Sequence, residues 1–500
     1  MTHAPARAVR DTIDGTIRVF LAEALVLPTG LLTAAFLSRR LGPEGYGLFT
    51  LAAASVMWIE WAITALFAGA TIKFVGSADD WRPIGTTVLR LHMITSVGAA
   101  LLLWLLAVPI ALLLNEATLA AFLALFAIDI PIYSLAHAHR NILIGMNGFG
   151  PRALASAGRW IVRLVLIVAL VQLGLSIQGA ILGSIAASLV ELAICRAYVR
   201  PSLVGPGLSA SRLWGYAAAL FLYALSLRLF ERLDLFALKA LGGTAEQAGL
   251  YGAAQNLALV PGIFALSFSP LLIGTLSRTL ALGQDHLARQ IGRDAMRAVL
   301  WLLPFGGLAA GTAPEIVELV FGRPFLPAAP LLEVLIFGAL AVAMISVAAA
   351  ILTAAGRPAW ILGMTLPLPP LALAGHLVAI PAFGAIGAAL VTTLLAALSA
   401  LAAVMAVYWL WRVSPPARTL CLSVALCVMV YVVAIFWPMP GALLLAKLSV
   451  ISVAIGLAFA IFGEISSAQL AQTVTALRGA LRTPRSEQPT DPQPVSGELS

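Results

Sequence analysis

The chain has 500 residues, of which 61% are hydrophobic and only 10% are charged, and its mean hydropathy is +1.00. Soluble domains are about half apolar and a quarter charged, so this composition excludes an ordinary soluble protein and indicates a polytopic membrane protein. The formal net charge of +8 does not require a nucleic-acid partner, because the Arg residues gather in short loops, as membrane topology signals do.

Long apolar runs separated by short loops predict about fourteen membrane-spanning helices and an all-α fold. The predicted spans are roughly 17–38, 47–68, 90–114, 118–139, 153–175, 178–198, 214–240, 249–277, 295–312, 328–354, 359–381, 384–411, 419–437 and 442–463. With both termini in the cytoplasm, most Lys and Arg residues fall on the cytoplasmic side, including Arg140 and Arg152. The outer side receives few: Arg39, Arg40, Lys239 and Arg323.

An internal repeat accounts for twelve of these spans. The segment 41–46 precedes the second span and the similar segment 241–251 precedes the eighth, with an offset of 242 − 42 = 200 between their glycines. Gly179–Ile181 recurs as Gly384–Ile386, an offset of 384 − 179 = 205. Six spans per repeat is an even number, which predicts two parallel six-helix bundles around an axis along the membrane normal, with a central site between them.

The repeat predicts five regions along the chain. They are an N-terminal six-helix lobe at 1–200, a cytoplasmic linker at 201–213, a C-terminal six-helix lobe at 214–411, two additional transmembrane helices at 412–464 and a cytoplasmic tail at 465–500. Apolar residues at helical spacing early in the tail predict an amphipathic helix on the membrane surface. The Pro- and Ser-rich end that follows predicts disorder.

The seventh predicted span carries an unusual group of charges in its middle: Arg228, Glu231, Arg232 and Asp234. Charges at that depth are costly and usually face the interior of a bundle or a wet cavity. Arg228 and Arg232 are four residues apart and share a helix face, and Glu231 adjoins it. Three interpretations stay open: an internally paired ion cluster that holds helices together, a cationic contact for an anionic substrate, or a different span boundary that puts the cluster in the headgroup region.

The N-terminal lobe carries a second group of intramembrane charges. A rise of ~1.5 Å per residue puts Arg159 ~10 Å into the fifth span, level with Glu191, and puts Arg163 near mid-depth, level with Asp129. One hypothesis is two ion pairs, Arg159–Glu191 and Arg163–Asp129. The other is that Arg163 and the pair Arg228/Arg232 line the cavity, where planar guanidinium groups suit a sugar-linked pyrophosphate.

Two further carboxylates, Glu23 and Glu60, are candidates for ion coupling. Both are predicted to lie ~10 Å from the cytoplasmic face, and two carboxylates that share a dry site favour proton coupling. The alternative is that Glu23 pairs with Arg18 and that Glu60 lies near the membrane interface.

Four segments carry a family resemblance: Ser38–Ala52, Phe67–Gly76, Ile142–Ala153 and Leu233–Ala258. Over about residues 10–410 the chain resembles the polysaccharide transporters. These are the O-antigen (Wzx-type) flippases of the multidrug/oligosaccharidyl-lipid/polysaccharide exporter superfamily. The resemblance implies a two-lobed fold of twelve or fourteen helices, alternating access and export of lipid-linked sugars. It also places Lys73 where the family usually has a basic residue and Asp234 where it often has an acidic one.

The resulting hypothesis is a flippase for a polyprenyl-diphosphate-linked oligosaccharide in a bacterial inner membrane. It needs no cofactor and no metal, and its expected partners are the lipid-linked oligosaccharide, membrane lipids, a proton or sodium ion and other polysaccharide assembly proteins. An enzyme is not expected, because the sequence has no nucleotide-binding, glycosyltransferase or hydrolase motif. The alternatives are a cation-coupled drug or small-molecule antiporter of the same superfamily and, in another class, a membrane-embedded polysaccharide polymerase or ligase.

Overall fold

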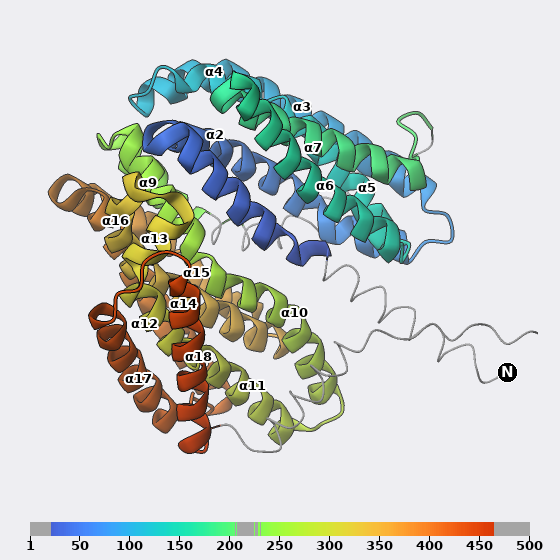
Figure 1. The fold of residues 1–500 in the computed structure, drawn as a ribbon. Helices are drawn as coiled ribbons and strands as arrows, with labels where there is room; N and C mark the ends of the chain where they lie inside the picture. The colour runs from blue at the N-terminus through green and yellow to red at the C-terminus, as the bar shows by residue number, and fades with distance from the viewer. Residues whose placement is uncertain (1–21, 206, 208–224, 226–228, 231, 465–500) are drawn as a thin grey trace, which may run out of the picture. The chain divides into compact units, whose positions relative to one another are not determined.

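The computed structural model describes residues 22–205, 207, 225, 229, 230 and 232–464. Every regular element among these residues is a helix and none is a strand, which confirms the all-α prediction (Figure 1). Arg228, Glu231, most of the predicted linker and seventh span, and the tail 465–500 lie outside the described residues. The chain divides into two units, 1–446 and 447–500, so the predicted boundary between two lobes falls inside the first unit and stays a prediction.

The first half of the described chain is built from long apolar helices joined by short turns. They are α2 (Val26–Gly76), α3 (Arg82–Leu113), α4 (Leu119–Phe126), α5 (Asp129–Gly145), α6 (Phe149–Leu170), the π-helical turn η1 (Val171–Leu175) and α7 (Ser176–Tyr198). Helices α6 and α7 pack against each other along their lengths, and α5 packs against α2, α3 and α7 (Figure 1).

The second half begins with a helical segment at 232–240. It continues with α9 (Ala245–Ala258), α10 (Val260–Ala281), α11 (Asp285–Leu300), α12 (Leu303–Gly311), α13 (Ala313–Phe321), the 3-10 turn η2 (Arg323–Ala328), α14 (Ala329–Ala354), α15 (Pro358–Thr365), α16 (Leu368–Trp411) and α17 (Ala417–Phe436). Helix α14 packs on α10 and α16, and α12 packs on α17. The last described helix, α18 (Leu443–Ile461), supplies most of the described part of the second unit.

Glycines with positive φ break the longest helices. A straight helix as long as α2, with 51 residues, would measure about 75 Å, far more than the ~30 Å of a bilayer core. Gly42 (φ 68°) interrupts α2 just before Pro43, and Gly174 (φ 92°) lies between α6 and α7. Gly384 (φ 58°) interrupts α16, which folds back so far that a Cβ added to Gly375 would lie 2.7 Å from a methyl group of Val391.

These breaks bear on the number of spans. By length and composition the described residues contain eight helices able to cross a membrane, or nine if the bent pair 285–311 and 313–321 counts as one span. Three of the eight, at 22–76, 149–198 and 363–411, contain a glycine break, and each covers two of the predicted spans. A multi-pass all-helical protein is therefore confirmed, whereas the count of fourteen spans stays a prediction.

The two halves of the chain meet where α2 crosses α9, at two glycines. A Cβ added to Gly47 would lie 1.9 Å from the carbonyl oxygen of Ala245, and one added to Gly249 would lie 2.0 Å from that of Pro43. The contact is reciprocal, with equal offsets of 249 − 47 = 202 and 245 − 43 = 202. Reciprocal contacts are typical of a two-fold relation, so the crossing supports the internal repeat. Small residues at such crossings let helix backbones approach closely in membranes.

An aromatic cluster packs beside this crossing. The ring of Tyr46 lies 5.7 Å from that of Phe325 in an edge-on arrangement and 6.2 Å from that of Phe321. Asn256 of α9 donates a hydrogen bond of 2.8 Å to the Tyr46 hydroxyl. The buried hydroxyl group thereby has a partner, and α2 is joined to α9, α13 and η2.

Replacing Gly47 by Ala tests the crossing. Because the added Cβ meets backbone, which cannot rotate away, we expect Gly47→Ala to destabilise the protein by about 1–3 kcal/mol, the usual cost of overpacking. The measurement is the melting temperature of the purified protein together with its abundance in the membrane. The matched control is Gly98→Ala in α3, where nothing lies within 4 Å of the added Cβ. Equal melting temperatures for the two variants would contradict the crossing.

Candidate functional site

Glu191 of α7 is the centre of the polar interior of the first half. Its side chain has no exposed surface and contacts two guanidinium groups. One oxygen accepts a hydrogen bond of 3.0 Å from Arg140 of α5, and the other lies 3.3 Å from Nε of Arg159 of α6. The guanidinium of Arg159 also stacks over the ring of Tyr133, 4.3 Å from its centroid. The Arg159–Glu191 pair predicted from depth is thus present, and it ties α5, α6 and α7 together.

Arg140, which is predicted to follow the fourth span on the cytoplasmic side, lies on a helix and not in a loop, and its side of the membrane stays a prediction. It lies inside α5, and its side chain is only 14% exposed. The reason is its ion pair: the long side chain reaches Glu191, so the positive charge is neutralised within the protein and not in a loop.

Arg163 differs from the two guanidinium groups that share Glu191. Its Nε donates to the hydroxyl of Ser184 at 3.4 Å, and its guanidinium lies 5.9 Å from the ring centroid of Trp160. The predicted ion pair with Asp129 does not form, because Arg163 contacts Ser184 of α7 whereas Asp129 bonds to Ser188, one turn further along. Within the described part of the chain, Arg163 has no acidic partner within 4 Å.

Glu60 of α2 and Asp129 of α5 are two carboxylates with incomplete hydrogen bonding. Both side chains are buried, and in each one a carboxyl oxygen has no hydrogen-bond partner among the described residues. Each carboxylate is attracted electrostatically to Arg159 and Arg163, and the two carboxylates repel each other. Buried polar atoms normally have a partner, so such atoms need an explanation, such as an ion, a water molecule or a functional role.

Glu23 is a more exposed carboxylate at the start of the described chain. Its side chain is 39% exposed, lies 3.6 Å from the guanidinium of Arg152 and accepts a hydrogen bond of 3.0 Å from Ser156. The alternative partner expected from the sequence, Arg18, lies outside the described residues. We name the eight charged residues of this region the N-terminal polar cluster. They are Glu23, Glu60, Asp129, Arg140, Arg152, Arg159, Arg163 and Glu191.

Asp234 is a fully buried acidic residue of the second half, as Glu191 is of the first. Its hydrogen bonds come from neutral groups and not from arginines. The side chain is fully buried and accepts four hydrogen bonds. The donors are the Tyr251 hydroxyl at 2.7 Å, the Leu235 amide at 2.8 Å, the Gln255 side chain at 2.9 Å and the Thr392 hydroxyl at 3.0 Å. These bonds join the segment 232–240 to α9 and α16.

Gln255 connects this network to Arg232. Its amide nitrogen donates to Asp234, while its amide oxygen accepts a hydrogen bond of 2.8 Å from the Arg232 guanidinium. A neutral side chain therefore orients Arg232. Tyr251, Gln255 and Thr392 carry no charge, so the pattern of charges in the sequence does not mark them. The i, i+4 spacing of Tyr251 and Gln255, which puts both on one face of α9, was the available signal.

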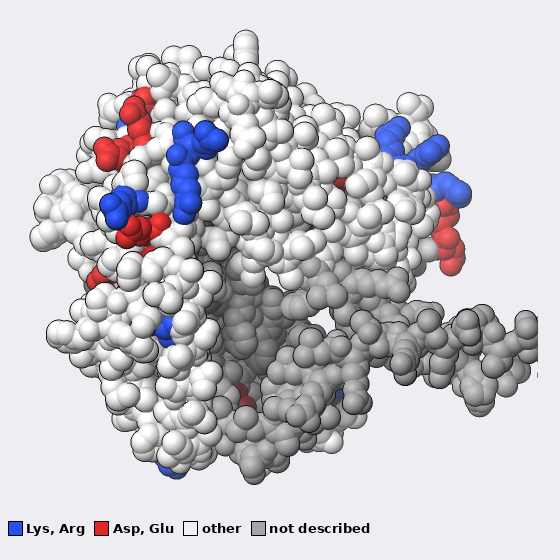
Figure 2. Space-filling model, in the orientation of Figure 1, with Lys and Arg blue, Asp and Glu red and all other residues white. Residues whose placement is uncertain are grey.

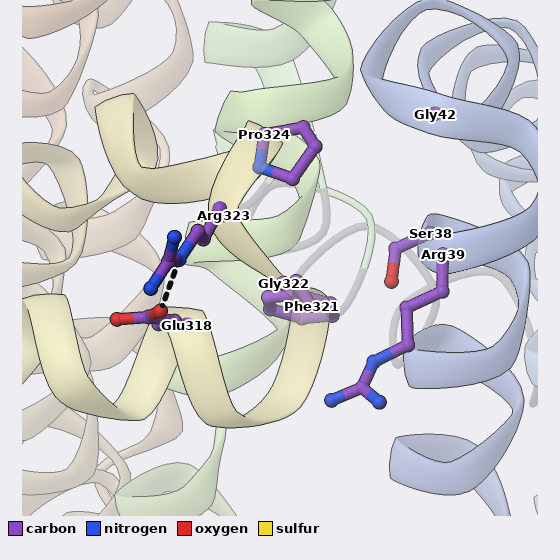
Figure 3. A pocket seen from close by; sticks show the side chains of 8 residues that line it. All are labelled: Ser38, Arg39, Gly42, Glu318, Phe321, Gly322, Arg323 and Pro324. Carbon is purple, nitrogen blue, oxygen red and sulfur yellow. Dashed lines mark hydrogen bonds and ion pairs between the residues drawn. The ribbon is translucent and has the colours of Figure 1, made fainter. Parts of the chain in front are cut away.

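A third polar region joins the two halves near the residues predicted to face outward. A cavity of about 370 Å³ is lined by Ser38, Arg39, Gly42, Glu318, Phe321, Gly322, Arg323 and Pro324 (Figure 3). Arg39 donates to the Leu319 carbonyl of α13, and Arg323 pairs with Glu318 at 2.9 Å. Lys239 is buried and pairs with Glu116 at 3.3 Å. On the face drawn in Figure 2, charged side chains gather in a few such places and most of the described surface is uncharged.

A family model described as polysaccharide biosynthesis protein matches residues 36–330. The chain belongs to this family. The match confirms the resemblance seen in the sequence. No curated relative of the chain was found by sequence.

The fold of this family member also resembles solved structures of transporters. The lipid II flippase MurJ in an inward closed conformation has a TM-score of 0.71 at 15% identity, with 90% of this chain and 98% of that one covered. An inward-facing multidrug resistance MATE transporter of the MOP superfamily has a TM-score of 0.64 at 13% identity, covering 78% and 94%. A mutant of the Vibrio cholerae MATE transporter VcmN has a TM-score of 0.59 at 16% identity, with 81% of this chain and 98% of that one covered. At these identities the likeness establishes the fold: a multi-pass membrane protein built like a flippase or transporter.

Glu191 and Glu23 provide a matched test of which acidic groups hold the fold together. Removing one partner of a buried ion pair costs about 3–5 kcal/mol, whereas an exposed pair contributes about 0–1 kcal/mol. Because Glu191 is fully buried between two arginines, we expect Glu191→Gln to reduce membrane abundance and melting temperature strongly and Glu23→Gln to change them little. Comparable losses in the two variants would contradict this assignment.

Proposed function

We propose that this chain translocates a polyprenyl-diphosphate-linked oligosaccharide across a bacterial inner membrane by alternating access between two lobes, 1–200 and 214–411, with both termini in the cytoplasm. Membership of the polysaccharide biosynthesis family and the MurJ- and MATE-like fold support this proposal. The observation that carries it is Arg163, a half-buried guanidinium inside an apolar helix that has no acidic partner in the described residues.

The substrate's diphosphate is the group that such an arginine would bind. A guanidinium offers planar, bidentate donors to phosphate oxygens, and the bond is stronger where water is excluded. In this proposal Arg163 makes the main contact of the N-terminal lobe, and Arg228 and Arg232 bind from the C-terminal lobe. Arg159 supports the site, because its charge is shared with Glu191 and its ring contact with Tyr133 fixes its position.

Alternating access requires the contacts between the two halves to separate. The hydrogen bond from Arg39 to the Leu319 carbonyl and the pair Lys239–Glu116 join residues more than 100 positions apart. Neither contact is a covalent or metal link, so each can break without a cofactor. On the predicted orientation both lie on the outer side, and they would hold that side closed while substrate enters from the cytoplasmic leaflet.

Replacing Arg163 tests the substrate site. We expect Arg163→Ala to reduce export of lipid-linked sugar at least tenfold per molecule of protein in the membrane, beyond any loss of abundance caused by removing its interactions with Glu60 and Asp129. Arg163→Lys should restore export only in part, since an ammonium group lacks the bidentate geometry. The measurement is export in cells, normalised to membrane protein, with the exposed Arg200→Ala as the control.

The double variant Arg228→Ala/Arg232→Ala extends this test to the other lobe. Loss of export at normal abundance supports a substrate role for the pair, whereas reduced abundance points to a structural role. Full export by both this variant and Arg163→Ala would refute the proposed site.

A second candidate function is cation-coupled antiport of a drug or small molecule, and the incomplete hydrogen bonding of Glu60 and Asp129 favours it. A proton or a sodium ion could be the coupling ion in either function. We expect Glu60→Gln to abolish transport driven by an ion gradient while the protein still folds, because the amide keeps the shape of the side chain but cannot exchange a proton.

The measurement is uptake into proteoliposomes with and without an imposed pH or sodium gradient. Transport of drugs without transport of lipid-linked sugar would favour the antiporter. Gradient-driven transport at the normal rate by Glu60→Gln would remove Glu60 from the coupling mechanism.

A further inference from the structure

A second cavity, outside the polar cluster and away from the crossing of α2 and α9, lies between α11 and the end of α16. Its volume is about 440 Å³, and it is lined by His286, Arg289, Gln290, Arg293, Asp294, Trp411, Arg412 and Val413. All of these residues belong to the second half of the chain, so this cavity is not formed between the two halves.

The cavity is a built feature of the fold. Helix α11 is amphipathic: it buries Ala288, Gly292 and Met296 and exposes Arg289 and Arg293. A Cβ added to Gly292 would lie 3.3 Å from the ring of Trp411, so the backbone of α11 rests directly on this indole. Packing of α11 on the end of α16 thereby fixes the exposed arginines beside Trp411.

Arg412 supplies a third cation from the other wall. It ends α16 in the left-handed conformation (φ 56°), and its guanidinium lies 5.6 Å from the ring centroid of Tyr408. The cavity therefore has three arginines against one acidic residue, Asp294, a formal charge of 3 − 1 = +2 without His286. Asp294 already lies 4.0 Å from Arg297, which offsets its charge. Arg289, Arg293 and Arg412 have no acidic partner within 4 Å in the described part of the chain.

An exposed apolar stripe runs along the second part of α16, on the face opposite Trp411. Leu394, Leu398, Leu401, Met405 and Trp409 are all exposed and follow one another at intervals of three or four residues, so they share one face of the helix. In a membrane-spanning helix such a face contacts acyl chains. Trp409 and Trp411 stand at the end of the helix, where tryptophans are enriched at the level of lipid headgroups.

We propose that this cavity is a binding site for an anionic phospholipid, with the phosphate among Arg289, Arg293 and Arg412. Basic pockets between transmembrane helices bind anionic headgroups. The cavity lies at the end of the candidate membrane span 363–411, next to Trp411, which places it at the level of lipid headgroups and favours a phospholipid over a soluble acidic protein. The diphosphate of a lipid carrier has similar chemistry, but the cavity opens on the surface of one half of the chain, where substrate in transit between lobes would not pass. On the predicted orientation the lipid belongs to the cytoplasmic leaflet.

The test uses the purified full-length chain in detergent and native mass spectrometry with phosphatidylglycerol and phosphatidylcholine of equal acyl chains. We expect Arg289→Gln/Arg293→Gln to weaken phosphatidylglycerol binding at this site about tenfold or more, since each arginine near a lipid surface contributes several-fold in affinity. Binding of phosphatidylcholine should not change. The charge-matched control is Arg200→Gln/Arg357→Gln, two exposed arginines outside the cavity.

Further variants separate the alternatives. Arg412→Gln, on the opposite wall, should weaken phosphatidylglycerol binding in the same direction, and Arg289→Lys/Arg293→Lys should retain most of it, because a lysine keeps the charge. Unchanged phosphatidylglycerol binding in both Gln variants would overturn the proposal. Loss of binding to polyprenyl diphosphate without loss of phosphatidylglycerol would also overturn it and assign the cavity to the substrate. Loss of an acidic protein partner with lipid binding intact would overturn it in favour of a protein interface.

Discussion

A charge in the interior of a membrane protein must find a partner inside the protein, and this constraint organises both halves of the chain. The two halves meet it differently. Glu191 is neutralised by Arg140 and Arg159, whereas Asp234 is surrounded by neutral donors from Tyr251, Gln255 and Thr392. Both solutions lock helices together. Against that background Arg163 stands out, because it has no acidic partner within 4 Å among the described residues. Glu60 and Asp129 differ from Glu191 because neither has a described ion pair within 4 Å to compensate for its unpartnered carboxyl oxygen.

Glycines set the geometry in which these charges meet. At Gly42, Gly174 and Gly384 a positive φ breaks a helix so that the chain can turn, and at Gly47 and Gly249 the missing side chain lets α2 and α9 touch. The crossing therefore combines close backbone contact with the buried aromatic cluster of Tyr46, Phe321 and Phe325 and with the hydrogen bond from Asn256 to Tyr46. In the proposed alternating access, separating the two halves would have to open this packing as well as the polar contacts.

Composition and hydrophobic length were sufficient to predict an all-helical membrane protein, and the spacing of Gly42 and Gly242 was sufficient to indicate a repeat. Depth along a helix correctly paired Arg159 with Glu191. The same depth argument wrongly paired Arg163 with Asp129, because equal depth does not specify how a side chain is rotated about its helix axis. Arg163 bonds to Ser184, whereas Asp129 bonds to Ser188, one helical turn away. The charge rule treated Arg140 only as a topology signal and did not predict its ion pair with Glu191, because a long side chain can turn back toward a buried acid. Neutral partners such as Gln255 do not stand out in the sequence as charged residues do. They become visible only when the structure shows their hydrogen bonds to residues of other helices.

The charge balance of the N-terminal polar cluster links the two parts of the proposed mechanism. Four arginines face four carboxylates, so the cluster is formally neutral when every group is ionised. An anion can then bind strongly only where Arg163 lacks an acidic partner or where a carboxylate has lost its charge. Protonation of Glu60 or Asp129 raises the net charge of the cluster from 0 to +1. In the proposed mechanism, binding of a diphosphate and binding of a proton would therefore favour each other, so that the two would move together. Antiport would instead require the proton and the transported molecule to compete, so the sign of this coupling separates the two candidate functions.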